Sequence, residues 1–95
     1  MTLDEIKAKR AEILKIAAHY GASNVRVFGS VARGEAARAS DVDLLVDMDA
    51  DRSLLDMGGL LMDFQDLLAC KVDLTTENSL HWYIKDKVLQ EAVAL

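Results

Sequence analysis

Two aspartates separated by one residue, Asp41 and Asp43, are the side chains of this sequence whose spacing best suits chemistry. They open an apolar run that predicts a β-strand, and residues i and i+2 of a strand point to one face, so we expect the two carboxylates to stand side by side. Like charges at that distance need a cation between them, and a divalent metal that prefers oxygen ligands is the natural candidate. A turn at Gly29 and Ser30 follows an earlier predicted strand and would suit a phosphate bound to that metal.

A third aspartate, Asp73, lies inside another short apolar run, KVDLTT. Its neighbours Val72 and Leu74 should point to the opposite face from its own, toward a core. If this strand pairs beside the strand of Asp41 and Asp43, the three carboxylates share one face and surround one or two metal ions. The pattern is equally compatible with an aspartate on an edge strand that faces water.

The elements that must hold these residues follow from the apolar periodicity and from the breakers, which predict the order αβαβαβα. Thr2 followed by Glu5 predicts a capping box at the first helix, and Gly21 predicts its end. Ser53 with Asp56 predicts the cap of the middle helix. The expected helices cover 3–20, a short segment from Gly29 through Ala37, 54–69 and a last stretch from Asn78 or Ser79 toward Leu95, and the expected strands cover 25–28, 41–48 and 71–76.

Length and composition restrict the class of protein. The 95 residues, 52% of them hydrophobic and 28% charged, predict one compact domain over 1–95. A formal net charge of -5 argues against direct binding to a nucleic-acid backbone. No apolar run approaches the roughly 20 residues of a membrane span, and the N-terminus is charged where a secretory signal would be apolar, so we expect no membrane association and a cytoplasmic location. A single cysteine, Cys70, agrees with a reducing compartment.

The motifs together resemble a known family. The strings GSVARGEA from Gly29, SDVDLLV from Ser40 and VDL from Val72, with EAV from Glu91 near the end, are similar to the polymerase-beta-type nucleotidyltransferase superfamily. Within it they closely resemble the minimal nucleotidyltransferases (MNT), the antitoxin halves of HEPN–MNT toxin–antitoxin pairs. The resemblance covers nearly the whole chain, and it implies an α/β (α+β) nucleotidyltransferase fold with a short mixed sheet of three to four strands packed with helices.

The resemblance also implies roles for the acidic residues. Asp41 and Asp43 would coordinate Mg²⁺, with one ion bridging the phosphate oxygens of ATP and a second, where present, activating the attacking hydroxyl. Asp73 would complete the second metal site or accept the proton. Asp41, Asp43 and Asp73 are therefore the predicted catalytic and metal-binding residues.

The predicted nucleotide-binding residues are Gly29, Ser30, Arg33 and Ser40. Ser30 and the backbone N–H groups after Gly29 would hold the β and γ phosphates. Arg33 has two interpretations, because its guanidinium can reach a phosphate or can fix the loop by pairing with an acid such as Glu35 or Asp41. Ser40 is either a turn residue or, as in the family, a neighbour of the metal site.

We expect the acceptor to be a protein, because no segment after the final predicted helix would bind a small molecule or an RNA. The resemblance implies a hetero-oligomer with the cognate HEPN toxin, an RNase, which members of the family neutralise by transferring AMP from ATP to a tyrosine. The alternative is an antitoxin that inhibits by binding alone. A second apolar stripe on the middle helix, formed by Leu55, Met62 and Ala69, fits a partner surface or a covering helix, and Trp82 and Tyr83 are either core fillers or interface anchors.

Overall fold

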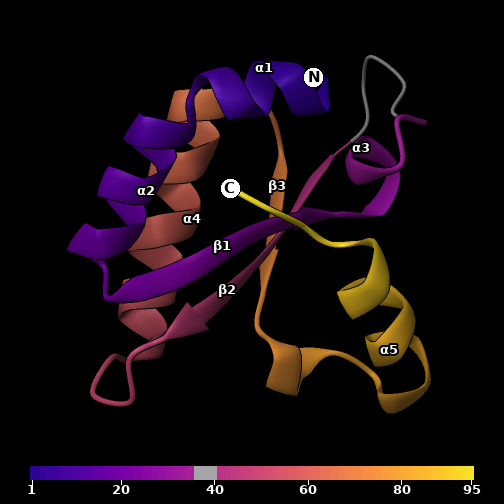
Figure 1. Ribbon diagram of the computed structural model, residues 1–95. Helices are drawn as coiled ribbons and strands as arrows, with labels where there is room; N and C mark the ends of the chain where they lie inside the picture. The colour runs from indigo at the N-terminus through magenta and orange to yellow at the C-terminus, as the bar shows by residue number, and fades with distance from the viewer. Residues whose placement is uncertain (36–40) are drawn as a thin grey trace.

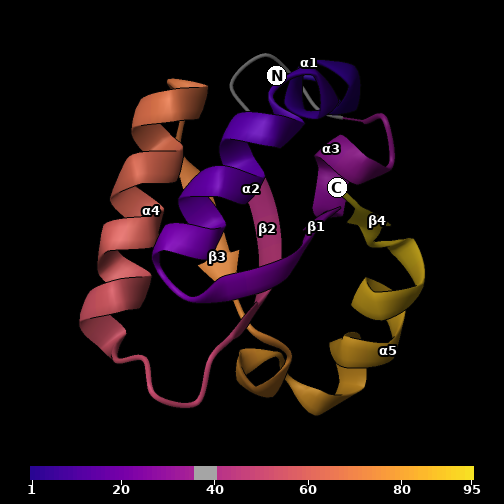
Figure 2. The same cartoon turned by 60° about the vertical axis from the view of Figure 1, so that its left-hand side comes forward.

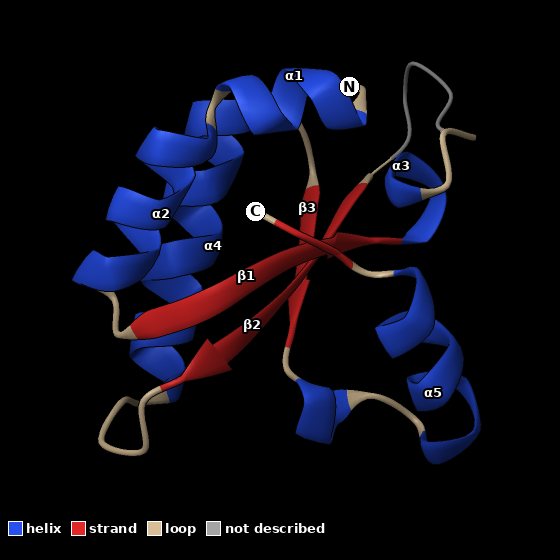
Figure 3. Ribbon diagram, in the orientation of Figure 1, coloured by secondary structure: helices blue, strands red, loops and turns tan. Residues whose placement is uncertain are grey.

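The centre of the molecule is a mixed four-stranded sheet with the strand order β3-β2-β1-β4, seen in the computed structural model, which describes residues 1–35 and 41–95 (Figure 3). β1 pairs antiparallel with both β2 and β4, whereas β2 and β3 run parallel. The predicted α/β fold with a short mixed sheet is confirmed. The strands are β1 (Ala22–Phe28), β2 (Val42–Met48), β3 (Val72–Thr75) and β4 (Val93–Ala94).

Helices lie on both faces of the sheet. Figures 1 and 2 show α1, α2 and α4 on one side of the strands and α5 on the other. The main core forms under α1, α2 and α4, where Ile13, Leu60 and Phe64 pack against alternate β2 residues such as Leu44. The helices are α1 (Leu3–Ala8), α2 (Arg10–His19), α3 (Gly29–Ala32), α4 (Leu54–Leu68) and α5 (Trp82–Glu91), with a 3-10 turn η1 (Glu77–Ser79).

The opposite face of β2 carries the intervening residues and has its own small buried region. Leu45 is fully buried but does not belong to the main core, and Val88 of α5 is buried in the same way. Asp43 and Asp47 flank Leu45 at i−2 and i+2, so they share this face. The predicted site therefore lies on the face of the sheet that is turned toward α5 (Figure 1).

Both predicted helix caps are present. Thr2 accepts a hydrogen bond from the Glu5 amide at 3.2 Å and begins α1. Ser53 and Asp56 form a reciprocal capping box at the start of α4. These local rules were sufficient to place both helix starts.

The single helix predicted over 3–20 is wrong, because the chain leaves helical geometry at Lys9. No glycine or proline marks the break. The Lys9 ammonium instead donates to the Leu67 carbonyl at 3.1 Å, in the last turn of α4. A lysine there satisfies a carbonyl that the helix cannot pair internally, and this contact between distant segments accompanies the bend.

The final helix is also shorter than predicted, and it is followed by a strand. α5 ends at Glu91, Ala92 is extended, and Val93 and Ala94 pair with Val27 and Arg26 of β1. The residues after Glu91 have no local strand signal; edge pairing with β1 determines their conformation. The sheet therefore has four strands, and the order αβαβαβα lacks both this strand and the break at Lys9.

Smaller differences concern the remaining boundaries. β1 begins at Ala22 rather than Val25, because an irregularity between Ser23 and Arg26, with Asn24 at φ 51°, lets a turn-like sequence continue the strand. The segment after Gly29 is helical only to Ala32. Its predicted end at Ala37 lies outside the described residues. The last helix begins at Trp82 rather than at Asn78 or Ser79, because those two residues belong to η1. The other helix and strand ends agree with the prediction to within one residue.

Several large apolar side chains are exposed. Leu55 and Met62 of α4 are 87% and 60% exposed, and Ala69 is exposed beside them, so neither α1 nor α5 covers this stripe. Trp82 and Tyr83 at the start of α5 are 80% and 66% exposed and contact each other edge to face, which contradicts their interpretation as core fillers. Along the described parts of the chain, no helix has the length and apolar character that crossing a membrane requires.

Candidate active site

Asp43 and Asp73 lie side by side. The parallel register of β2 and β3 pairs these two residues directly, and the same row continues to Phe28 of β1. Their neighbours Val42 and Val72 are buried on the face that α1, α2 and α4 cover. Both carboxylates therefore point to the opposite face, where α5 lies. The two interpretations of Asp73 are both correct in part: β3 is an edge strand and Asp73 is exposed, yet its side chain stands beside Asp43.

The environment of Asp43 disfavours its charge. Burial raises the pKa of this carboxyl to about 6, and the negative charges of Asp73 and Asp41 and a hydrogen bond to Asp73 act in the same direction, with a smaller opposing effect of Arg33. Within residues 1–35 and 41–95, no ion pair joins Asp43 or Asp73 to a lysine or arginine. A divalent cation would supply the missing positive charge.

Asp41 lies just before β2 and is held differently. Its carboxylate is 3.7 Å from the Lys71 ammonium, an exposed pair at the start of the neighbouring strand. In the described residues, no three His, Cys, Asp or Glu side chains are grouped closely enough to hold a metal ion. The structure therefore brings Asp43 and Asp73 together and places Asp41 near them without completing a three-ligand cluster. Two carboxylates are still a donor set that suits Mg²⁺, which keeps several waters and takes its other ligands from substrate phosphates.

The Gly29 turn lies directly against the Asp43 carboxylate. Gly29 follows β1 with φ at +73°, a conformation that favours glycine. A Cβ atom at this position would collide with the Asp43 carboxylate. Glycine is required here by both the backbone conformation and the space. Ser30 follows in the first turn of α3, so the predicted phosphate-binding turn and the predicted metal ligands are in contact.

Arg33 is fixed by two carboxylates. Its Nε donates to Glu35 at 2.9 Å, and its Nη1 donates to Glu91 at 3.1 and 3.2 Å. Of the two acids predicted as partners of Arg33, Glu35 is present and Asp41 is not. Glu91 was missed as a contact of the site, although it opens the EAV string; no helical or strand periodicity connects the end of the chain to the turn at Gly29. Ser40 lies outside the described residues.

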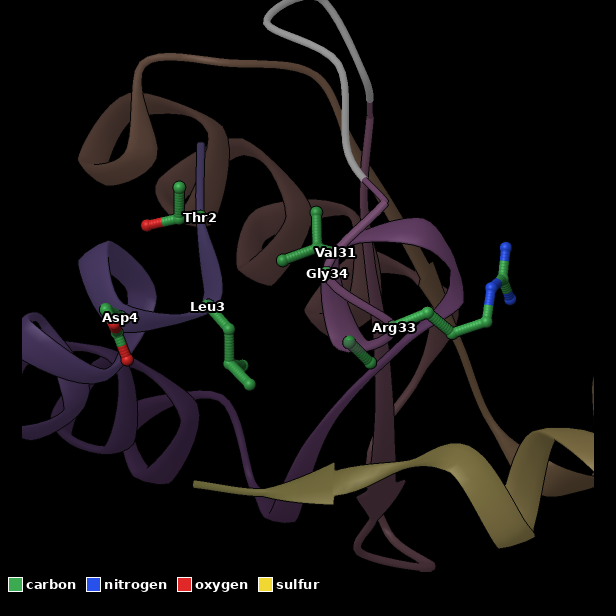
Figure 4. A pocket seen from close by; sticks show the side chains of 7 residues that line it. Thr2, Leu3, Asp4, Val31, Arg33 and Gly34 are labelled. Carbon is green, nitrogen blue, oxygen red and sulfur yellow. The ribbon is translucent and has the colours of Figure 1, made fainter.

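A pocket of about 340 Å³ lies beside the predicted nucleotide-binding turn, between α3 and the start of the chain. It is formed by the start of α1 and by α3, and Figure 4 shows that the Arg33 guanidinium points away from Thr2, Leu3 and Asp4. None of the three predicted metal ligands lines it. The lining residues are Thr2, Leu3, Asp4, Val31, Ala32, Arg33 and Gly34.

Comparisons with known proteins identify the family of the chain. Residues 9–95 match the nucleotidyltransferase domain family. A Methanocaldococcus jannaschii protein whose name proposes protein adenylyltransferase activity is 40% identical over 93 residues, which cover 98% of this chain and 97% of the relative. Protein adenylyltransferase MntA of Thermococcus cleftensis is 39% identical over 94 residues, which cover 98% of this chain and 95% of the relative.

Solved structures share the fold. One, described as a proposed minimal nucleotidyltransferase, superposes with a TM-score of 0.88 and 44% identity over 100% of this chain and 97% of that chain. A second, a toxin-antitoxin with AMP-PNP, has a TM-score of 0.73 and 21% identity over 88% of this chain and 69% of that chain, and it supports the fold alone. The prediction of a nucleotidyltransferase is confirmed: the chain belongs to the nucleotidyltransferase domain family.

Proposed function

We propose that this protein is an antitoxin that transfers AMP from ATP to a tyrosine of a cognate HEPN toxin in a Mg²⁺-dependent reaction. The observation that carries the proposal is that Asp43, paired across the sheet with Asp73, contacts the Gly29 turn, so that the proposed metal ligands lie beside the proposed phosphate-binding backbone. The names of the relatives support protein adenylylation. The toxin as partner is proposed by analogy with the toxin-antitoxin that has a similar fold. The HEPN class and the tyrosine come from the family resemblance of the motifs.

Asp43 and Asp73, with Asp41 beside them, would hold Mg²⁺, which when bound neutralises phosphate charge and lowers the pKa of the attacking hydroxyl. Ser30 and the backbone N–H groups after Gly29 would orient the β and γ phosphates. The tyrosine oxygen forms a bond to the α-phosphorus of ATP, the bond between the α-phosphorus and the bridging oxygen breaks, and pyrophosphate leaves. Asp73, the exposed member of the pair, takes the tyrosine proton.

The exposed apolar side chains support a protein as the acceptor. Leu55, Met62, Trp82 and Tyr83 are all more than half exposed, on α4 and on the start of α5. Large apolar side chains that gather on a surface are typical of protein interfaces, and Trp and Tyr are enriched there. These side chains give the toxin two candidate contact surfaces outside the carboxylate pair.

One observation favours the alternative, an antitoxin that acts by binding alone. Asp41 is paired with Lys71, and the described residues contain no complete three-ligand cluster. The raised pKa of Asp43 argues against this alternative, because a protein that only binds its partner needs no such group. The experiment below separates the two functions.

The test mixes the protein with its cognate toxin, ATP and Mg²⁺ and measures the intact mass of the toxin. We expect the toxin to gain the mass of one AMP or more and the tyrosine to carry it. The double variant Asp41→Asn/Asp43→Asn should abolish the gain. A matched control, Asp49→Asn/Asp51→Asn, removes the same charge from two exposed residues near the end of β2 and should transfer normally. Full inhibition of the toxin with no change in its mass would establish the binding-only antitoxin instead.

A further inference from the structure

Glu91, at the end of α5, contacts the predicted nucleotide-binding turn through its carboxylate. Its carboxylate accepts a hydrogen bond from the backbone N–H of Gly29 at 3.1 Å and two from Nη1 of Arg33 at 3.1 and 3.2 Å. The side chain is only 17% exposed. One carboxylate therefore contacts both the backbone and the cation of the turn.

The chain on either side of Glu91 is itself anchored. Val88, one turn earlier in α5, is buried and accepts a hydrogen bond from the Ala92 amide at 2.9 Å. Immediately after Glu91, β4 pairs with the part of β1 that leads into Gly29, through Val93 and Val27. Figure 1 shows α5 running toward α3 before the chain enters β4. The carboxylate is thus delivered to the turn by two packed elements.

The contacts of Glu91 determine which donors of the turn stay available. The Gly29 N–H is occupied by Glu91, so the N–H groups that follow it are the ones left to meet an anion. Arg33 donates from Nη1 to Glu91, whose side chain is 17% exposed, and from Nε to Glu35, whose side chain is 64% exposed. The better-buried contact with Glu91 therefore does most to orient the guanidinium. Donors that are already oriented bind a ligand at a smaller entropic cost.

We propose that Glu91 is a positioning residue for nucleotide binding: it fixes the Gly29 peptide and the Arg33 guanidinium in the orientation that receives the polyphosphate. This proposal rests on the proposed function of the turn. If Glu91 positions the turn, its removal should weaken nucleotide binding. Simple electrostatics predicts the opposite, because removal of a carboxylate that only repelled the phosphates or filled their place would strengthen binding.

The test measures the affinity for α,β-methylene-ATP with Mg²⁺ by titration calorimetry, since that analogue cannot lose pyrophosphate. Glu91→Ala and Glu91→Asp should each weaken binding about 10-fold, because the alanine has no acceptor and the aspartate is one methylene too short. Glu91→Gln keeps an acceptor for the Gly29 N–H and should stay within about 3-fold of the unmodified protein.

Glu35→Ala is the matched control. It removes one carboxylate and one Arg33 contact but none of the contacts with Gly29, so it should change the affinity by less than about 3-fold. The exchange rate of the Gly29 amide hydrogen, measured by NMR, should rise in Glu91→Ala and stay unchanged in Glu35→Ala. If Glu91→Ala does not fold, the aspartate and glutamine variants provide the same contrast.

Equal or tighter binding by Glu91→Ala or Glu91→Asp would overturn the proposal, and so would equal losses in Glu91→Ala and Glu35→Ala. The failure of the proposed function is a separate result. An unmodified protein that binds the analogue but never modifies the toxin contradicts the transfer reaction and leaves the role of Glu91 to be decided by the affinities. An unmodified protein that binds no nucleotide contradicts both.

Discussion

On the face of the sheet turned toward α5, a buried charge is paired at one end and, within the described residues, lacks a partner of opposite charge at the other. At one end, Arg26 is almost fully buried, and its Nη1 and Nη2 each donate at 2.9 Å, to Glu77 and Asp47 respectively, while its Nε donates to the Asn24 carbonyl. At the other end, Asp43 is partly buried beside a second carboxylate. The two rows cross β2 at Asp43 and at Leu45, only two residues apart. The comparison distinguishes charges that hold the fold from charges that await a ligand.

The physical difference lies in where the compensation comes from. In the Arg26 cluster, defined as Arg26 with Asp47 and Glu77, the buried guanidinium is paired with two carboxylates of the same chain. A buried charge requires such partners. The carboxylate pair, Asp43 with Asp73, lacks a cationic partner among residues 1–35 and 41–95. A like-charge pair destabilises the folded chain, and such groups concentrate at functional sites.

The largest expected effect is on AMP transfer. Asp43→Asn should lower the rate of transfer to the toxin by about 10³-fold or more, because it removes a proposed ligand of the Mg²⁺ that would act at the reacting phosphate. Asp47→Asn changes an aspartate on the same strand and the same face, four residues away, that belongs to the Arg26 cluster. It should transfer within about 3-fold of the unmodified protein per folded molecule. Initial rates measured by mass spectrometry check both variants, and equal losses would show that the two ends do not differ in function.

The second-largest expected effect concerns the Arg26 cluster and is a loss of stability. Arg26→Met should lower the free energy of unfolding by about 2 kcal/mol, because it leaves two carboxylates without their cation in a partly buried region. The loss is below that of a fully buried pair since Asp47 and Glu77 are 51% and 39% exposed. Urea denaturation with a constant m value measures the change. A loss below about 0.5 kcal/mol would mean that the cluster contributes little to the fold.

The sequence allowed prediction of those parts of this face that depend on local patterns. The alternation around Asp41 and Asp43 predicted that these two carboxylates point to one face, and a run of apolar residues around Asp73 predicted a third strand. The pairing of β2 with β3 was one of two possibilities, because strand order depends on contacts between distant segments. Caps at Thr2 and Ser53 were predictable for the same local reason as the strands.

The features that sequence analysis missed all depend on tertiary contacts. Lys9 breaks a helix while its ammonium binds a carbonyl of α4, and β4 forms because β1 has an open edge. Glu91 reaches Gly29 only because α5 ends beside the turn. The Arg26 cluster joins residues from β1, β2 and η1. Periodicity describes one element at a time and contains no information on such contacts.

A smaller effect follows from the like charges of the carboxylate pair. Asp43→Asn should stabilise the metal-free protein by about 1 kcal/mol at pH 8, less than the full pKa shift would give because the group is only partly buried. The folded pKa of about 6 lies above the unfolded value, so the folded chain binds more protons between pH 4 and 6. The unmodified protein therefore loses stability as pH rises through that window, and the asparagine variant does not.

Thermal unfolding in EDTA at pH 4 and pH 8 measures this difference. The melting temperature of Asp43→Asn should exceed that of the unmodified protein by a few degrees at pH 8, and the two should coincide at pH 4, where Asp43 is protonated. Asp47→Asn should show no gain at pH 8, because its carboxylate is paired with Arg26. A gain in both variants would indicate a general effect of the net negative charge.

The smallest effect separates the causes of the raised pKa. Burial is the largest cause for Asp43 and the charge of Asp73 is the second. Asp73→Asn should therefore lower the pKa of Asp43 by less than about one unit and leave it above the ordinary value, whereas Asp47→Asn should not move it. A ¹³C NMR titration of the Asp43 carboxyl reports the pKa directly. A return of Asp43 to an ordinary pKa in Asp73→Asn would mean that the neighbouring charge, and not burial, dominates. In that case a cation held by either carboxylate would remove the repulsion and lower the pKa of Asp43. If burial dominates, only a ligand that contacts Asp43 itself would lower that pKa.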